Sequence, residues 1–142
     1  MKDPTDSIIT TFYRNLNGQL KYNNKNWPFK TFGELTDDYD NVNLIDVTFE
    51  DIADEDDFIH ECTVLIEVKE GSVNMASWKG TNAIGNQIVE RIAYKELSFE
   101  DFDLVGEIMV SGNLLKDYSD INIITRKLLR FRFKLQENGD NS

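Results

Sequence analysis

The sequence predicts an α+β fold, an antiparallel (mixed at most) β-sheet with two helices packed on one face plus a small β-hairpin. In two separate segments apolar residues recur at steps of three and four, which is the period of an amphipathic helix. Elsewhere they alternate with polar residues, which is the period of a strand. The resulting order of helix, hairpin, two strands, helix and two strands is typical of α+β proteins.

The first helix is predicted from Asp3-Pro4 to Asn17-Gly18. An Asp side chain caps free backbone amides, and Pro at the first helical position loses no hydrogen bond. Gly usually takes the left-handed position that follows a helix, so we end the helix there. Its apolar face comprises residues spaced by one, three and four positions: Ile8, Ile9, Phe12, Tyr13 and Leu16.

A hairpin is predicted between residues 20 and 30, because alternating apolar residues flank a polar four-residue loop at 23–26. Pro28 has no backbone N–H, so the second strand is expected at a sheet edge or a bulge. Trp27 and Phe29 are expected to pack over the first helix.

Two longer strands are predicted at 42–52 and 58–69, the second of them central in the sheet. We expect Gly71-Ser72 to end this central strand. Its buried face is expected to hold alternate residues: Phe58, His60, Cys62, Val64, Ile66 and Val68.

The helical period returns between 75 and 95, most clearly from Thr81 to Tyr94, with Ala76, Ile84, Ile88 and Ile92 along one stripe. Gly80 and Gly85 each weaken a helix by about 1 kcal/mol relative to Ala, which indicates an irregular first half or a close neighbour. A strand at 104–110 follows. Ser111-Gly112-Asn113 is expected to close it, leaving a loop at 114–120.

The strongest structural signal is the strand predicted at 121–135. From Leu129 onward apolar and cationic residues alternate strictly, so one face is expected to be buried and the other to form a cationic stripe. Fifteen extended residues span on the order of 50 Å, so the strand is expected to bend or to project beyond its domain. The buried face is expected to hold Leu129, Phe131, Phe133 and Leu135.

The charges are segregated along the chain. The formal net charge is −11, and half of the 26 acidic residues lie between Lys30 and Lys69, where no Lys or Arg occurs. This arrangement favours head-to-tail self-association; the alternative is a cross-strand charge ladder within one subunit. The candidate basic contacts to a neighbouring subunit are Arg126, Arg130, Arg132 and Lys134. The candidate acidic interface residues are Asp37, Asp38, Asp40, Asp54, Glu55, Asp56 and Asp57.

The length of 142 residues suits a single domain, placed at 1–135, followed by a polar tail at 136–142. Cys62 has no second cysteine to pair with, which indicates a reducing compartment. No signal peptide or membrane-spanning run is evident, so we expect a soluble protein with no membrane partner. The negative charge argues against general nucleic-acid binding, and the cationic stripe lacks the interleaved aromatics on which single strands stack.

No catalytic site, cofactor or dedicated metal site is predicted. His60 and Cys62 share a strand face, but their apolar neighbours favour core packing, and no third residue that would orient such a pair is evident. The acidic turns at 37–40 and 51–57 depart from the calcium-loop template. The chain also lacks a glycine-rich phosphate loop.

The order of these elements resembles the tail-terminator and tail-completion proteins of tailed bacteriophages. The resemblance covers nearly the whole chain and rests on these segments: the helix from Asp6-Ser7-Ile8-Ile9 to Leu16 with Asn17-Gly18, the hairpin from Leu20 to Lys30, the strand from Glu61 to Val68, the helix from Asn86 to Ile92 and the strand from Arg126 to Phe133.

This resemblance implies a virion protein, assembled in the host cytoplasm, that forms a homo-oligomeric ring, usually a hexamer, in the tail or neck. Such a ring ends tube growth or joins tail to head, contacts the tail-tube and connector proteins, and leaves a channel through which DNA passes without sequence-specific binding. The candidate acids between 37 and 57 are then also candidates for the channel wall, since a basic wall would hold the phosphates. The family has no catalytic signature. The alternative function is a monomeric cytosolic module whose acidic surface binds a basic protein.

Overall fold

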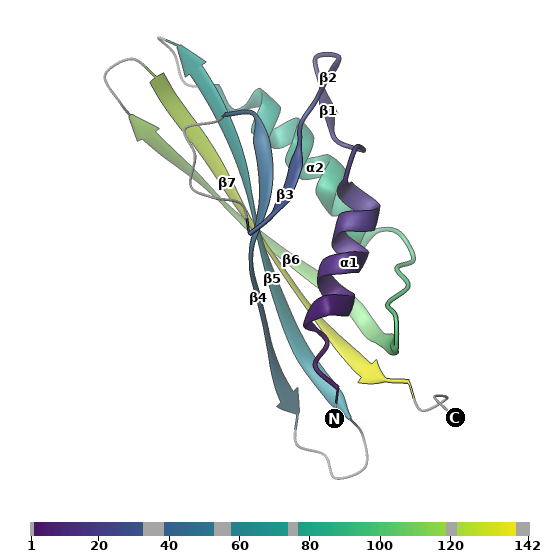
Figure 1. Cartoon of the computed structure of the whole chain (residues 1–142). Helices are drawn as coiled ribbons and strands as arrows, with labels where there is room; N and C mark the ends of the chain where they lie inside the picture. The colour runs from purple at the N-terminus through teal and green to yellow at the C-terminus, as the bar shows by residue number, and fades with distance from the viewer. Residues whose placement is uncertain (1, 33–38, 53–57, 74–76, 119–121, 139–142) are drawn as a thin grey trace.

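A five-stranded sheet, with both helices on one of its faces, forms the body of the protein in a computed structural model (Figure 1). The structure describes residues 2–32, 39–52, 58–73, 77–118 and 122–138. The α+β prediction is confirmed. The elements in chain order are α1 (Thr5–Leu16), β1 (Lys21–Tyr22), β2 (Lys25–Asn26), β3 (Phe29–Thr31), β4 (Asn41–Ile52), β5 (Ile59–Val73), α2 (Lys79–Ala93), β6 (Phe102–Tyr118) and β7 (Asn122–Glu137).

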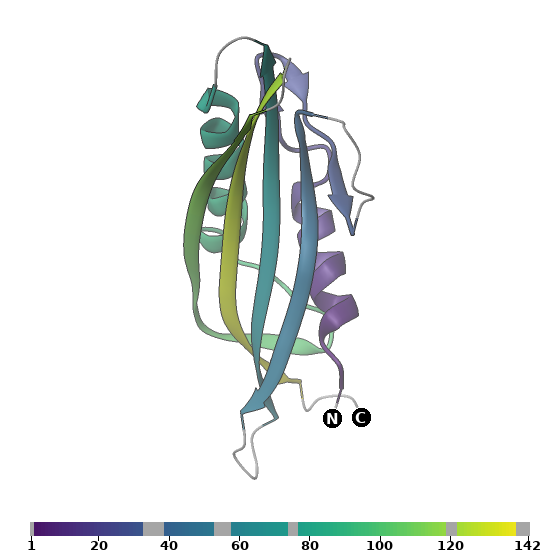
Figure 2. The ribbon, with the colours of Figure 1, turned by 90° about the vertical axis from the view of Figure 1, so that its left-hand side faces the viewer.

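The strands lie in the order β3-β4-β5-β7-β6, so β5 is central as predicted. Neighbours are antiparallel except for β3, which runs parallel to β4, and the sheet is therefore mixed. Helix α1 packs against β3 and β4, and α2 packs against β5, β6 and β7. The opposite face carries no helix and is turned toward the viewer in Figure 2, where the strands curve along their length. We call it the open face.

Strands β5, β6 and β7 are longer than predicted, with 15, 17 and 16 residues. The predicted breaks at Gly71-Ser72 and at Ser111-Gly112-Asn113 are wrong, because both segments pair with β7. A Cβ at Gly112 would lie 3.2 Å from Leu129 Cδ2, and one at Gly71 would lie 2.5 Å from the Tyr39 ring. These glycines therefore allow close approach within a continuing strand.

The hairpin is tighter than predicted. Strands β1 and β2 enclose only Asn23 and Asn24, whose φ angles of 52° and 60° suit a two-residue turn. The predicted four-residue loop is wrong, and Phe29 belongs to the separate strand β3. The prediction for Pro28 is confirmed, because β3 is an edge strand and the Pro28 carbonyl accepts a hydrogen bond from the Val42 N–H.

Helix α1 ends as its sequence predicts, but Pro4 occupies its N-cap and not the predicted first helical position, so the helix begins at Thr5. The Asp3 carboxylate accepts a hydrogen bond from the Thr5 N–H at 2.8 Å, and Gly18 after the helix has a φ of +73°. Ile8, Phe12 and Leu16 are fully buried, whereas Tyr13 is exposed at the margin of the helix face.

Helix α2 is regular from Lys79, and its two glycines mark close contacts. The predicted start at Met75 and the stripe residue Ala76 lie outside the described residues. A Cβ at Gly80 would lie 2.8 Å from the Glu70 carboxylate, and one at Gly85 would lie 3.2 Å from the Lys127 side chain. Of the two explanations offered for the glycines, close packing against a neighbour is the correct one.

The core lies between the helices and the sheet. Phe12 of α1 has its ring centroid 5.8 Å from that of Phe131 and 6.1 Å from that of Phe133. Trp27 and Phe29 are buried as predicted, with the Phe29 ring beside that of Tyr13. Phe58 precedes β5 and is 55% exposed, so its predicted place on the buried face is wrong. The predicted buried faces of β5 from His60 to Val68 and of β7 from Leu129 to Leu135 are confirmed.

Candidate functional site

The cationic stripe of β7 lies on the open face. Arg130, Arg132 and Lys134 are exposed and alternate with the buried residues Leu129, Phe131, Phe133 and Leu135. Across the ladder the three basic residues lie opposite Leu65, Thr63 and Glu61 of β5. Arg126 occupies the same face four residues earlier, opposite Lys69, and is half-buried. The structure thus brings together the basic residues that the alternation predicted.

Acidic side chains from β4 and β5 border this stripe. Glu61 and Glu67 alternate along β5, and Asp46 and Glu50 occupy the open-face positions of β4. The Arg132 Nη2 atom lies 3.6 Å from Glu61 Oε1 within the same subunit. Because both side chains are about half exposed, such a pair contributes at most about 1 kcal/mol. For Arg132, this ion pair supports a charge ladder within one subunit, which was the alternative to head-to-tail contacts between subunits.

Together these charges surround a shallow hollow on the open face. Its floor is formed by short or uncharged side chains of β4 and β5, and its rim carries charges of both signs. The lining residues are Asp46, Thr48, Phe49, Glu50, Glu61, Thr63, Leu65, Arg130 and Arg132. The four acids Asp46, Glu50, Glu61 and Glu67 were not among the predicted candidates, although alternation along their strands is the signal that places them on one face.

The predicted acidic candidates lie elsewhere. Asp37, Asp38, Asp54, Glu55, Asp56 and Asp57 fall outside the described residues. Asp40 directly precedes β4, where its carboxylate lies 3.5 Å from Lys25 Nζ and accepts a hydrogen bond from the Gly71 N–H at 3.4 Å. These contacts link the start of β4 to β5, away from the hollow.

Both sides of the sheet present long unpaired edges in the part of the chain that the structure describes. Strand β6 pairs only with β7, over its whole length. On the other side, β3 pairs with β4 only at Val42–Leu44, which leaves Asp46–Ile52 without an outer strand. Figure 2 shows these edges on opposite sides of the sheet. Unprotected edges present free N–H and C=O groups to another chain.

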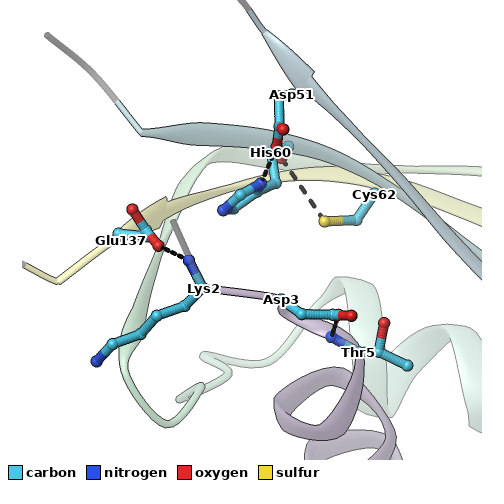
Figure 3. A network of polar contacts seen from close by, with 7 residues as sticks. All are labelled: Lys2, Asp3, Thr5, Asp51, His60, Cys62 and Glu137. Atoms are coloured by element: carbon cyan, nitrogen blue, oxygen red, sulfur yellow. Dashed lines mark hydrogen bonds and ion pairs between the residues drawn. The ribbon is translucent and has the colours of Figure 1, made fainter.

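His60 and Cys62 are both buried in the core. The Cys62 thiol donates to the His60 carbonyl oxygen at 3.6 Å, and His60 Nδ1 lies 2.6 Å from Asp51 Oδ1 (Figure 3). Burial, with a smaller contribution from Glu61, raises the pKa of Cys62 to about 12. The thiol is therefore protonated at neutral pH and has no contact with solvent, which suits core packing and not nucleophilic attack.

Asp51 is the orienting partner of His60 that was not predicted from the sequence. It lies directly opposite His60 in the β4–β5 ladder, so the strand register is the signal that would have identified it. The His60 ring also makes edge contacts with Phe49 and Phe102, at centroid distances of 5.6 and 5.7 Å. The imidazole is thus held within an aromatic part of the core.

The first and last described segments of the chain meet beside this cluster. The Lys2 backbone N–H donates to the Glu137 carboxylate (Figure 3). Lys2 Nζ also lies 3.9 Å from the Asp101 carboxylate. Strand β7 extends two residues beyond the predicted domain end, and 139–142 of the predicted tail lie outside the described residues.

Among the described residues, no cluster of three or more His, Cys, Asp or Glu side chains is arranged to hold a metal ion. Within the same part of the chain, neither helix has the length and apolar character needed to cross a bilayer. Comparison with models of known protein families and with curated protein sequences found no match.

Proposed function

We propose that this chain is a structural subunit of a tailed-bacteriophage particle, a ring that ends the tail or joins tail to head around a DNA channel. The observation that carries the proposal is the sheet, which leaves one charged face and two long edges uncovered within the described residues. A subunit that assembles with copies of itself requires uncovered surfaces through which the copies make contact. In a protein that does not assemble, such long sheet edges are usually covered or blocked.

The electrostatics support the same proposal. A ring needs two different complementary surfaces on each subunit, because its contacts are head-to-tail. On one side of the sheet, the half of β4 that β3 does not cover bears acids. On the other side, the edge strand β6 lies next to the cationic strand β7. A net charge of −11 also suits a conduit that must release DNA phosphates.

The proposal extends to the surroundings of the ring. Its partners are further copies of itself, tail-tube proteins and head or neck connector proteins, and its location is the tail or neck region of the virion. The competing function is a monomeric acidic module that binds a basic protein. The ion pair between Arg132 and Glu61 favours this alternative, because it partly neutralises the stripe within one subunit.

Light scattering after size-exclusion chromatography, at several protein and salt concentrations, tests the proposal together with electron micrographs of the protein mixed with tail tubes. We expect oligomers or rings at tube ends, and oligomers that weaken as salt screens the charges. A protein that remains monomeric throughout and forms no ring on tubes is the monomeric module.

A further inference from the structure

The outer edge of β6 is protected over only part of its length. Near its start, Asp103 precedes a bulge between Val105 and Met109, and the bulge itself contains Glu107 and Gly106, whose φ is +77°. Charges and bulges are the devices by which natural sheets block unwanted pairing. The next eight residues, Ile108–Leu115, carry no charge and no proline. This segment is therefore able to accept another strand.

The complementary edge is the second half of β4. After the irregularity between Leu44 and Asp46, the seven residues Asp46–Ile52 pair with β5 alone among the described strands. Seven residues of the uncharged segment of β6, Met109–Leu115, can pair with them one to one. The two edges lie on opposite sides of the sheet, so one copy can offer its β4 to a second copy while its own β6 receives a third (Figure 2).

Strand direction favours the pairing of β4 with β6. Because β4, β5, β7 and β6 are successively antiparallel, β4 and β6 run in opposite directions. A neighbour related by rotation about an axis roughly along the strands therefore presents β4 antiparallel to β6, with helices on the same side of the joined sheet. Antiparallel ladders are also slightly more stable per residue than parallel ones.

The open-face side chains select one register. An antiparallel alignment of Asp46–Ile52 with Met109–Leu115 places Ile52 opposite Met109. In the single subunit the exposed fractions of these two side chains are 36% and 66%. It also places Glu50 opposite Ser111, which in turn lies opposite Arg130 of β7. Two strand spacings separate Glu50 of one copy from Arg130 of the next, about 10 Å between backbones. Two long side chains can meet over the small Ser111.

We infer that neighbouring copies join edge to edge, with β4 Asp46–Ile52 of one copy extending the sheet of the next at β6 Met109–Leu115. The inference rests on the proposed ring function and identifies its subunit contact. Pairing β6 with itself is less favourable, because it brings two cationic β7 strands toward each other and leaves the β4 edges unpaired. The β4–β6 contact is heterologous and closes into a ring when the rotation between copies does.

A disulfide test isolates this contact. In the inferred register Thr48 lies opposite Asn113 of the next copy, on the same face, so the variant Thr48→Cys/Asn113→Cys is expected to form disulfides between copies. Within one copy β5 and β7 lie between these positions, and the three strand spacings alone amount to about 14 Å, twice the reach of a disulfide. The native Cys62 is buried and is not expected to compete.

Under mild oxidation we expect a ladder of trimers and larger species on a non-reducing gel, with loss of most of the monomer band. The matched control Thr63→Cys/Asn113→Cys moves the first cysteine to central β5 and is expected to remain monomeric on the gel. Dimers formed by Asn113→Cys alone would overturn the inference, because they would indicate β6 pairing with itself.

The outcomes also separate the inference from the function on which it rests. Rings seen by light scattering and microscopy without the Thr48–Asn113 crosslink would overturn the β4–β6 contact and leave the ring function standing. If the double-cysteine variant does not crosslink, and neither it nor the unmodified protein forms rings on tail tubes, both the β4–β6 contact and the ring function are overturned.

Discussion

The His60 side chain is a buried polar group whose environment combines apolar contacts with one charged neighbour. Its ring lies between Phe49 and Phe102, and Asp51 reaches its Nδ1 atom from the adjacent strand. Strand alternation predicted the burial of His60, because the side of the sheet to which a residue points depends only on its position along its own strand. It did not predict Asp51, because a cross-strand partner depends on the register between segments distant in sequence.

Cys62 yields a pH-dependent prediction at this scale. Burial, and to a lesser degree Glu61, raises the pKa of the folded-state thiol from 9.0 to about 12. The unfolded chain therefore ionises first, and the contribution of the protonated thiol to stability is lost as pH rises from about 9 toward 12. We expect the stability advantage of the unmodified protein over Cys62→Ala to narrow across that range.

Urea unfolding of both proteins under reducing conditions, at pH 8 and at pH 10.5, checks this expectation. Because Lys and Tyr residues titrate in both proteins alike, the difference between the two isolates the thiol. A difference that stays constant with pH would show that the Cys62 thiol ionises equally in both states.

Glycines show why the lengths of the strands were not predicted while their faces were. In sequence, Gly71 and Gly112 are indistinguishable from turn residues, yet both lie inside long strands against Tyr39 and Leu129. The bend in β6 occurs instead at Gly106, whose positive φ an L-residue adopts with strain. Glycine is favoured both where the backbone turns and where another element approaches the strand closely. Only the packing of elements distant in sequence shows which of the two roles a given glycine has.

The attachment of α2 to the sheet depends on Glu70. Its buried carboxylate accepts a hydrogen bond from the Thr81 N–H at 2.9 Å, and it lies against Gly80 in the first turn of the helix. Removing it leaves a buried N–H without its partner at the positive end of the helix dipole. We expect Glu70→Ala to lower the free energy of unfolding by about 1–3 kcal/mol.

Urea unfolding of a series of variants checks the origin of this effect. Glu70→Gln keeps an acceptor and loses only the charge, so its loss is expected to be smaller than that of Glu70→Ala. Glu67→Ala, on the open face of the same strand, is expected to stay within about 0.5 kcal/mol of the unmodified protein. Equal losses at Glu67 and Glu70 would contradict the capping role.

For the molecule as a whole, alternation in the sequence placed the cationic residues of β7 on one face of that strand, but it did not show which strands lie beside β7. The helical and strand periods sufficed for the α+β class and for the inward faces of β5 and β7. The order β3-β4-β5-β7-β6 was not predictable, because long-range pairing sets it. That order is what brings Glu61 to Arg132 and leaves β6 and the second half of β4 without an outer neighbour among the described strands.

Charge reversal on β7 tests assembly at this scale. Arg130 has no ion pair within the described residues and, in the inferred contact, faces Glu50 of the next copy across Ser111. Arg130→Glu is therefore expected to keep the fold, because its side chain is exposed, and to weaken self-association several-fold at low salt. Arg132→Glu is expected to weaken it less, because Arg132 already pairs with Glu61 of its own subunit.

The swap variant Glu50→Arg/Arg130→Glu is expected to recover association, because it restores opposite charges at every copy-to-copy contact. Lys95→Glu, which makes the same charge change at an exposed position just after α2, is the control for net charge and is expected to have little effect. Light scattering at low and high salt, with circular dichroism to confirm folding, provides the measurement. If the swap associates no better than Arg130→Glu alone, Glu50 and Arg130 do not meet across the contact, and the charge on β7 acts only through the overall repulsion between copies.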